Sequence, residues 1–188
     1  RYNQVVDALA NYYNSIQVGD PFDESIDQGP LAAVRARDRV ERYVDIAKKD
    51  GASVATGGHR PKHLNRGWFY SPTLLAEVNN DMTIAQEEVF GPVTAVIAHD
   101  GIEDAINIAN DSRFGLACSI YTKDREIALN AARKIRSGAV AINSAGVSLT
   151  QPFGGYKQSG WGRECGPEGI LEFTQIKQVM SAASYLDS

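Results

Sequence analysis

A regular alternation of strand and helix patterns between residues 93 and 143 constrains the fold of this chain most strongly. The buried-type strand VTAVIAHD is followed by the amphipathic helix pattern IEDAINIAND, the strand ACSIYT, the helix pattern KDREIALNAARKIRSG and the strand AVAIN. Strands and helices that alternate at short spacing are joined by right-handed crossovers, which bring the strands into a parallel sheet. The sequence therefore predicts an α/β fold with a parallel sheet.

Further elements are predicted on either side of this alternation. The apolar residues of YNQVVDALANYYNSI follow the helical period, and a long charged helix is expected over roughly residues 31–49, with Gly51 at its C-cap. Short strands are expected in ASVATGG and in WFYSPTLL, which Pro72 interrupts. A short helix, PEGILEF, precedes a terminal strand over residues 175–181.

Charge and composition exclude several classes of function. The chain has 188 residues and a formal net charge of -4, so no basic surface indicates a nucleic acid or an anionic membrane as partner. No apolar run approaches the roughly eighteen residues of a membrane span. The cysteines Cys118 and Cys165 form neither a metal pattern nor a disulfide framework, which favours a cytoplasmic location. His59 and His63 lie in a loop pattern rich in Gly and Pro, so no metal site is predicted.

The stretch QPFGGYKQSGWGRECGPEG, residues 151–169, contains six glycines. It has no GK[ST] for a phosphate-binding loop, and GWGREC lacks the last glycine of a dinucleotide fingerprint and follows no strand directly. From glycine content alone, a sharply turning surface loop remains an alternative. Because the stretch comes after a sheet strand, we expect it at the carboxyl edge of the parallel sheet, where ligands bind.

The residue order in this stretch resembles the PFGGxKxSGxGRExG segment of the aldehyde dehydrogenase superfamily. TIAQEEVFGPV resembles the EExFGPV cofactor motif, and DQGPL, GWFYSPTLL, AINIANDSRFGLACSIYT and SGAVAIN resemble family segments in the same order. The resemblance implies the C-terminal portion of such an enzyme, with most of its catalytic domain. Residues 1–173 would be the C-terminal part of a three-layer, parallel-sheet catalytic domain, and residues 174–188 an oligomerisation strand and tail. The Rossmann cofactor domain would be absent from the chain, which we expect to be a piece of a longer protein because it begins within a helix pattern.

The resemblance also implies a reaction. Aldehyde dehydrogenases of this kind oxidise an aldehyde to a carboxylic acid with NAD or NADP, through a cysteine thiohemiacetal and a thioester. The nucleophilic cysteine and the main general-base Glu would lie outside this chain, so the chain alone is expected to be inactive. Cys118 is predicted to be buried and inert, and Cys165 stands where the family has an apolar residue.

Four residues are implied to bind the cofactor. Glu88 would accept hydrogen bonds from the nicotinamide ribose hydroxyls, because a carboxylate can accept two donors. Phe90 would pack beside the nicotinamide ring, with a core Phe as the alternative. Leu116 and Arg39 would approach the cofactor, the alternatives being a core side chain and an exposed charge. Ala36 replaces a Gln common in the family, which puts the contact on the adenosine side in doubt.

Three residues are implied to lie at the substrate. Glu164 would serve as a secondary proton relay, or would form only a local ion pair. Phe153 occupies an aromatic position of the substrate tunnel, where relatives selective for betaine aldehyde have Trp to bind a cation. Ser144 begins a short uncharged segment, residues 144–150, that would anchor the substrate and favours a neutral aldehyde.

The partners implied are a small-molecule aldehyde and a second copy of the chain, in a homodimer or a tetramer. The edge of the strand over residues 175–181 would be unpaired in a monomer and is expected to pair with a neighbouring subunit. Two other functions remain open: a non-catalytic assembly module with the same fold, and an acylating semialdehyde dehydrogenase that transfers the acyl group to coenzyme A.

Overall fold

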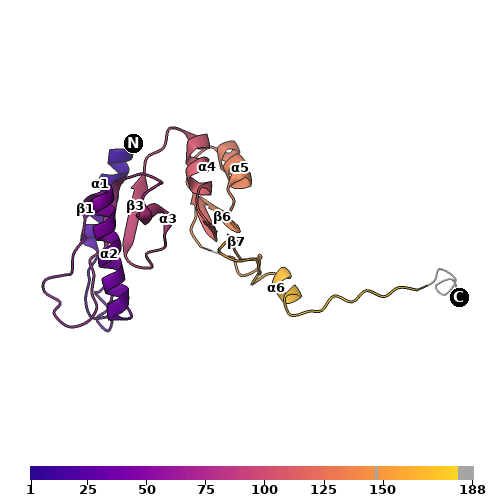
Figure 1. The fold of residues 1–188 in the computed structure, drawn as a ribbon, viewed down its shortest axis with the longest axis horizontal. Coiled ribbons are helices and arrows are strands. Elements are labelled where there is room, and N and C mark those ends of the chain that lie inside the picture. The colour runs from indigo at the N-terminus through magenta and orange to yellow at the C-terminus, as the bar shows by residue number, and fades with distance from the viewer. Residues whose placement is uncertain (147, 182–188) are drawn as a thin grey trace. The chain divides into compact units, whose positions relative to one another are not determined.

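Two structural units make up the chain, Arg1–Gly101 and Ile102–Ser188 (Figure 1). The computed structural model describes residues 1–146 and 148–181. Most of the predicted helices and strands are confirmed within a few residues of their expected bounds.

The first unit contains three helices and a three-stranded sheet in its described residues. Its elements are α1 (Tyr2–Ser15), α2 (Val34–Asp50), β1 (Ser53–Thr56), β2 (Thr73–Val78), α3 (Thr83–Gln86) and β3 (Val93–Ile97). The strand order is β1-β2-β3, with β1 antiparallel and β3 parallel to β2. Strand β2 begins directly after Pro72, which has no N–H group to donate to a ladder.

Helices α1 and α2 cover opposite faces of this sheet. Val40, Val44 and Ala47 of α2 are fully buried and pack in one cluster with Val93 and Ala95 of β3, among other residues. Thr94, between them on the strand, is joined by a 2.6 Å hydrogen bond to the Tyr13 hydroxyl of α1. Because successive strand residues point to opposite faces, the first unit has helix, sheet and helix layers.

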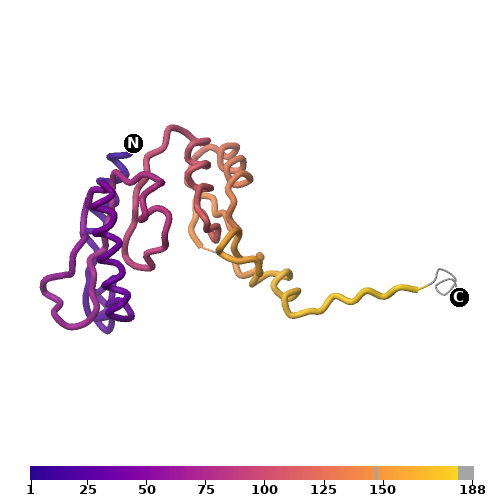
Figure 2. Tube along the Cα trace, viewed as in Figure 1, coloured from indigo at the N-terminus to yellow at the C-terminus, as the bar shows by residue number. Residues whose placement is uncertain are grey.

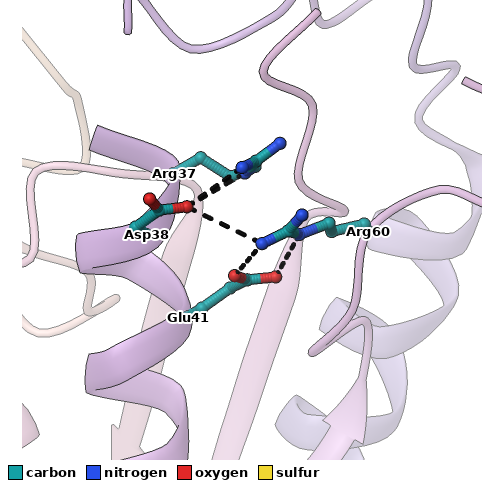
Figure 3. A network of polar contacts seen from close by, with 4 residues as sticks. All are labelled: Arg37, Asp38, Glu41 and Arg60. Carbon is teal, nitrogen blue, oxygen red and sulfur yellow. Dashed lines mark hydrogen bonds and ion pairs between the residues drawn. The ribbon is translucent and has the colours of Figure 1, made fainter. Parts of the chain in front are cut away.

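The loop between β1 and β2 is tied to α2 by the ion pairs in Figure 3. Arg60 makes a two-pronged contact with Glu41, with Nε 2.6 Å from Oε1 and Nη2 2.5 Å from Oε2. Its Nη2 also lies 3.6 Å from Asp38, which is paired with Arg37. The hydrogen bond from Arg60 lowers the pKa of the Glu41 carboxyl below its ordinary value. Helix α2 ends as predicted at Gly51, which has a φ of 106°.

The second unit contains the rest of the predicted alternation. Its elements are α4 (Ile102–Asn110), β4 (Phe114–Gly115), β5 (Ala117–Ile120), α5 (Arg125–Lys134), β6 (Ala139–Ile142), β7 (Tyr156–Lys157) and α6 (Glu168–Leu171). Strands β5 and β6 are parallel across the α5 crossover, and β4 and β7 form a short antiparallel pair. Asp124 caps α5, since its carboxylate accepts from the N–H groups of Glu126 and Ile127.

The three strands of the predicted alternation are paired separately within the two units, and each unit confirms a parallel pair. Strand β3 is paired with β2 in the first unit, while β5 and β6 are paired in the second. The connection from β2 to β3, residues 79–92, contains α3, a single helical turn that was not predicted. The whole connection is long enough to return the chain parallel to β2. Each unit therefore has its own parallel pair.

The terminal strand is not present over residues 174–181, the part of it that lies within the described residues. These residues have no strand pairing, and Figure 2 shows them running away from α6. Ile176, Val179 and Met180 are all largely exposed. A strand forms only when its N–H and C=O groups meet a partner, and this segment finds none in the described part of its own unit. Residues 182–188 of the predicted tail lie outside the described residues.

No helix in the described residues is both long and apolar enough to cross a lipid bilayer.

Candidate functional site

The loop of residues 87–91 presents two predicted cofactor-binding side chains. Val89 is buried in the core of the first unit, while Glu88 and Phe90 on either side are exposed. Phe90 is 74% exposed and has a φ of 52°, in the left-handed region that few residues other than glycine adopt. The structure therefore excludes, within this unit, the alternative of a core Phe.

Two side chains of α2 contact this loop. Arg39 Nη2 donates a 3.2 Å hydrogen bond to the carbonyl oxygen of Phe90, and its guanidinium carbon lies 6.0 Å from the centre of the Phe90 ring. Tyr43 donates a 2.6 Å hydrogen bond to Glu87 Oε2, which raises the pKa of the Tyr43 hydroxyl. Arg39 is half-buried rather than the freely exposed charge of the alternative reading.

The glycine-rich stretch packs backbone against backbone in the second unit. A Cβ added to Gly138, directly before β6, would collide with the carbonyl oxygen of Gly154. A Cβ on Gly154 would in turn collide with the carbonyl oxygen of Gly162. Phe153 and Glu164 are joined by two backbone hydrogen bonds of 2.7 Å each. The glycines are required because two chain segments approach closer than any side chain permits.

The two cationic residues of the same stretch are committed to backbone carbonyls. Arg163 Nη1 donates to the carbonyl oxygens of Gly155 and Gly162 at 3.0 and 2.8 Å. Lys157 Nζ donates to two carbonyl oxygens at 2.9 Å each, that of Asn110 at the end of α4 and that of Ser112 just beyond it. These contacts hold the shape of the stretch, so neither cation is a candidate for catalysis.

Two cavities of the second unit collect the remaining predicted residues. The first has a volume of about 670 Å³, and its lining includes Leu116, Phe153, Glu164 and Cys165. The second has a volume of about 810 Å³, and its lining includes Ser144 and again Phe153. Phe153 thus lies between the two spaces, and the fold brings Leu116, Glu164 and Ser144 around it.

Neither cysteine has the surroundings of an activated nucleophile. Cys118 on β5 is half-buried, less than predicted, and burial raises the pKa of its thiol. A raised pKa keeps the thiol protonated, whereas the thiolate is the nucleophilic form. Cys165 is free and half-buried, with a φ of 61°. The described residues contain no group of three or more His, Cys, Asp or Glu arranged to hold a metal ion.

Sequence reasoning missed Tyr43 and Trp161. Tyr43 lies four residues after Arg39, which places both on one face of the predicted helix 31–49, so a shared contact could have been inferred from spacing. Trp161 lines the 670 Å³ cavity and is 87% exposed. The signal available in the sequence was a tryptophan between two glycines, Gly160 and Gly162.

Comparison with known proteins identifies the class to which this α/β chain belongs. The model of the aldehyde dehydrogenase family matches residues 1–179. A Staphylococcus haemolyticus protein is 45% identical over 173 residues, and the geranial dehydrogenase of Castellaniella defragrans is 41% identical over 179 residues. A crystal structure of Mycobacterium tuberculosis aldehyde dehydrogenase complexed with NAD+ has a TM-score of 0.91 and 47% identity. This chain belongs to the aldehyde dehydrogenase family.

The chain spans only about a third of these proteins. The matches cover 92%, 95% and 93% of this chain, but 36%, 37% and 36% of the Staphylococcus, Castellaniella and Mycobacterium chains. The narrower recognition from sequence, a C-terminal portion that carries most of the catalytic domain, is wrong, because the matches give only a segment of about a third of each relative. The comparisons establish a family segment of about a third of the parent length, without that placement, and we retain only the family.

Proposed function

We propose that this chain contributes cofactor-binding and substrate-lining residues to an NAD(P)-dependent aldehyde dehydrogenase that oxidises an aldehyde to a carboxylic acid. One observation carries the proposal: the loop 87–91 buries Val89 and turns both Glu88 and Phe90 outward. Exposing a phenylalanine at a strained φ costs free energy, which a binding role for its ring would account for.

The residues of this loop fit a nicotinamide cofactor. When bound, NAD or NADP accepts a hydride from the aldehyde carbon. The Glu88 carboxylate can accept hydrogen bonds from both hydroxyls of a ribose diol, and the exposed Phe90 ring offers an apolar surface to a planar ring. Leu116 of the second unit is 44% exposed, and its contact with the cofactor stays a prediction from the sequence. The NAD+ complexes of the Mycobacterium and Bacillus cereus relatives support this assignment.

The substrate we propose is an uncharged, largely apolar aldehyde. None of the described residues that line the 810 Å³ cavity is charged, and Phe153 and Ser144 are among them. The Castellaniella relative is named for geranial, and a Staphylococcus aureus relative with 40% identity is a betaine aldehyde dehydrogenase. The absence of a carboxylate from the lining favours the uncharged alternative. Glu164, exposed and paired through its backbone to Phe153, would serve as a secondary proton relay.

We expect no aldehyde-dependent NADH formation from the purified 188-residue chain. The nucleophile would come from another part of the parent protein, because burial raises the pKa of the Cys118 thiol and, by the resemblance, Cys165 stands where the family has an apolar residue. The measurement is absorbance of NADH with the chain, NAD and an aliphatic aldehyde, beside the full-length protein. Steady turnover by the chain that disappears in the Cys165→Ala variant would show that this cysteine is a nucleophile.

We further propose that the parent is a cytoplasmic homodimer or tetramer that uses residues 174–188. Three apolar side chains of this segment, those of Ile176, Val179 and Met180, are at least 83% exposed. Deleting residues 174–188 from the full-length protein is expected to dissociate the oligomer and lower its melting temperature, since association stabilises the folded state. Light scattering and thermal denaturation measure both effects. An unchanged mass and melting temperature would show that the segment has no role in assembly.

A further inference from the structure

One face of α2 is shaped to hold the loop 87–91. It consists of Arg39, Val40 and Tyr43, which we call the α2 clamp. We propose that Arg39 and Tyr43 are positioning residues that fix Glu88 and Phe90 in the geometry the cofactor requires. This inference rests on the proposed function, because Glu88 and Phe90 are its cofactor-binding residues.

The loop contacts the clamp at three of its five residues. Glu87 accepts from the Tyr43 hydroxyl at 2.6 Å, and the Phe90 carbonyl accepts from Arg39 Nη2 at 3.2 Å. A Cβ added to Gly91 would collide with the Val40 side chain, so the loop backbone rests directly on the helix. Val89, also in the loop, is inserted into the core. Glu88 is thus an exposed carboxylate in a loop whose neighbouring residues, Glu87 and Val89, are both held.

The backbone conformation of Phe90 is the part of the loop that requires stabilising contacts. Its φ of 52° is rarely adopted by residues with a side chain, and such conformations persist only where the surroundings impose them. Arg39 supplies the constraint twice, because it binds the carbonyl of this residue and places its guanidinium 6.0 Å from the ring centre. A planar guanidinium can donate and stack at the same time, which an ammonium cannot do equally well.

A direct contact of Arg39 with the cofactor is the competing role. Its Nη2 is already committed to the Phe90 carbonyl, and its Nε is buried without a hydrogen-bond partner in the described residues. A side chain buried at this atom and engaged at the other supports the loop rather than reaching out from it. Arg39 therefore acts through Phe90, and Tyr43 acts through Glu87.

The test uses the full-length protein with Arg39→Met and Tyr43→Phe, which remove the donors and keep much of each apolar surface. Arg35→Gln, at an exposed position of the same helix, controls for loss of a positive charge. We expect kcat/KM for NAD to fall about tenfold in each clamp variant and to stay unchanged in the control, because small displacements of bound groups slow reaction strongly. Arg39→Lys, which restores a donor, is expected to recover part of the loss.

A second measurement separates this inference from the proposed function. Amide hydrogen exchange across residues 87–91, without cofactor, is expected to rise in both clamp variants and to stay constant in Arg35→Gln. Unchanged exchange and unchanged kcat/KM would overturn the clamp. A lower melting temperature with unaltered kinetics would also overturn it, since that result describes a purely structural contact. If the unmodified protein is inactive with NAD and with NADP for every aldehyde tried, the proposed function fails, while the exchange result still decides the clamp.

Discussion

Replacing Gly138 with alanine is expected to destabilise the second unit by about 2–3 kcal/mol, the upper part of the usual range for inserting a methyl group into a closed interior. The added Cβ would collide with the carbonyl oxygen of Gly154 and press on Gly155. Both obstacles are backbone atoms, so no side-chain rotation relieves the collision. Relief requires the glycine-rich stretch to move away from β6, together with Phe153, the residue directly before Gly154.

Urea denaturation of the full-length protein measures the effect, and Gly162→Ala is the matched control. Gly162 lies in the same stretch, but an added Cβ there would meet only the tip of the Glu172 side chain, 4.0 Å away. The control is expected to change the unfolding free energy by less than about 0.5 kcal/mol. Equal stability of the Gly138 and Gly162 variants would show that the close approach of Gly138 and Gly154 does not exist in solution.

Replacing Glu88 with glutamine in the full-length protein is expected to slow hydride transfer by on the order of a hundredfold, the cost of displacing a reacting group by about 1 Å. The amide keeps the size of the carboxylate but offers one acceptor oxygen in place of two, so the nicotinamide ribose would be held by fewer hydrogen bonds. Single-turnover rates with ordinary and deuterated aldehyde measure the step, and a larger isotope effect is expected when hydride transfer limits the rate.

Glu24→Gln provides the control for charge, since Glu24 is an exposed carboxylate of the first unit far along the chain from the loop 87–91. Its rate and isotope effect are expected to match those of the unmodified protein. If Glu88→Gln gives the same rate and isotope effect as Glu24→Gln, the proposed ribose contact is wrong.

Local signals in the sequence were sufficient for most elements of the fold. Three signals depend only on residues that are close in sequence: the helical period of residues 2–15, the glycine at the end of α2 and the position of Pro72. Strand pairing could not be predicted in the same way, because β3 has parallel partners available both before and after it along the chain. The short helix α3 was missed because four residues carry too little periodicity to be seen.

The residues of the candidate site could be predicted from the sequence, but the tertiary contacts that position them could not. The resemblance pointed to Glu88, Phe90, Phe153 and Glu164 by motif, and those roles remain predictions. The bond from Tyr43 to Glu87 spans 44 residues, and no local pattern announces a contact between positions so far apart. Likewise, the tail over residues 174–181 has the composition of a strand, but composition cannot show whether a partner is present.

The contact between Gly138 and Gly154 also explains how a family can be recognised from a single sequence. Where a carbonyl oxygen occupies the place of a Cβ, nineteen of the twenty amino acids are excluded by geometry alone. At each such position only glycine fits, whereas a core leucine can be replaced by isoleucine or methionine that fills a similar volume. Within residues 151–169, Gly154, Gly155 and Gly166 are such positions, because an added Cβ at each would lie within 3.0 Å of backbone atoms. Substitution of side chains elsewhere does not remove these backbone atoms, so the glycines identify the stretch.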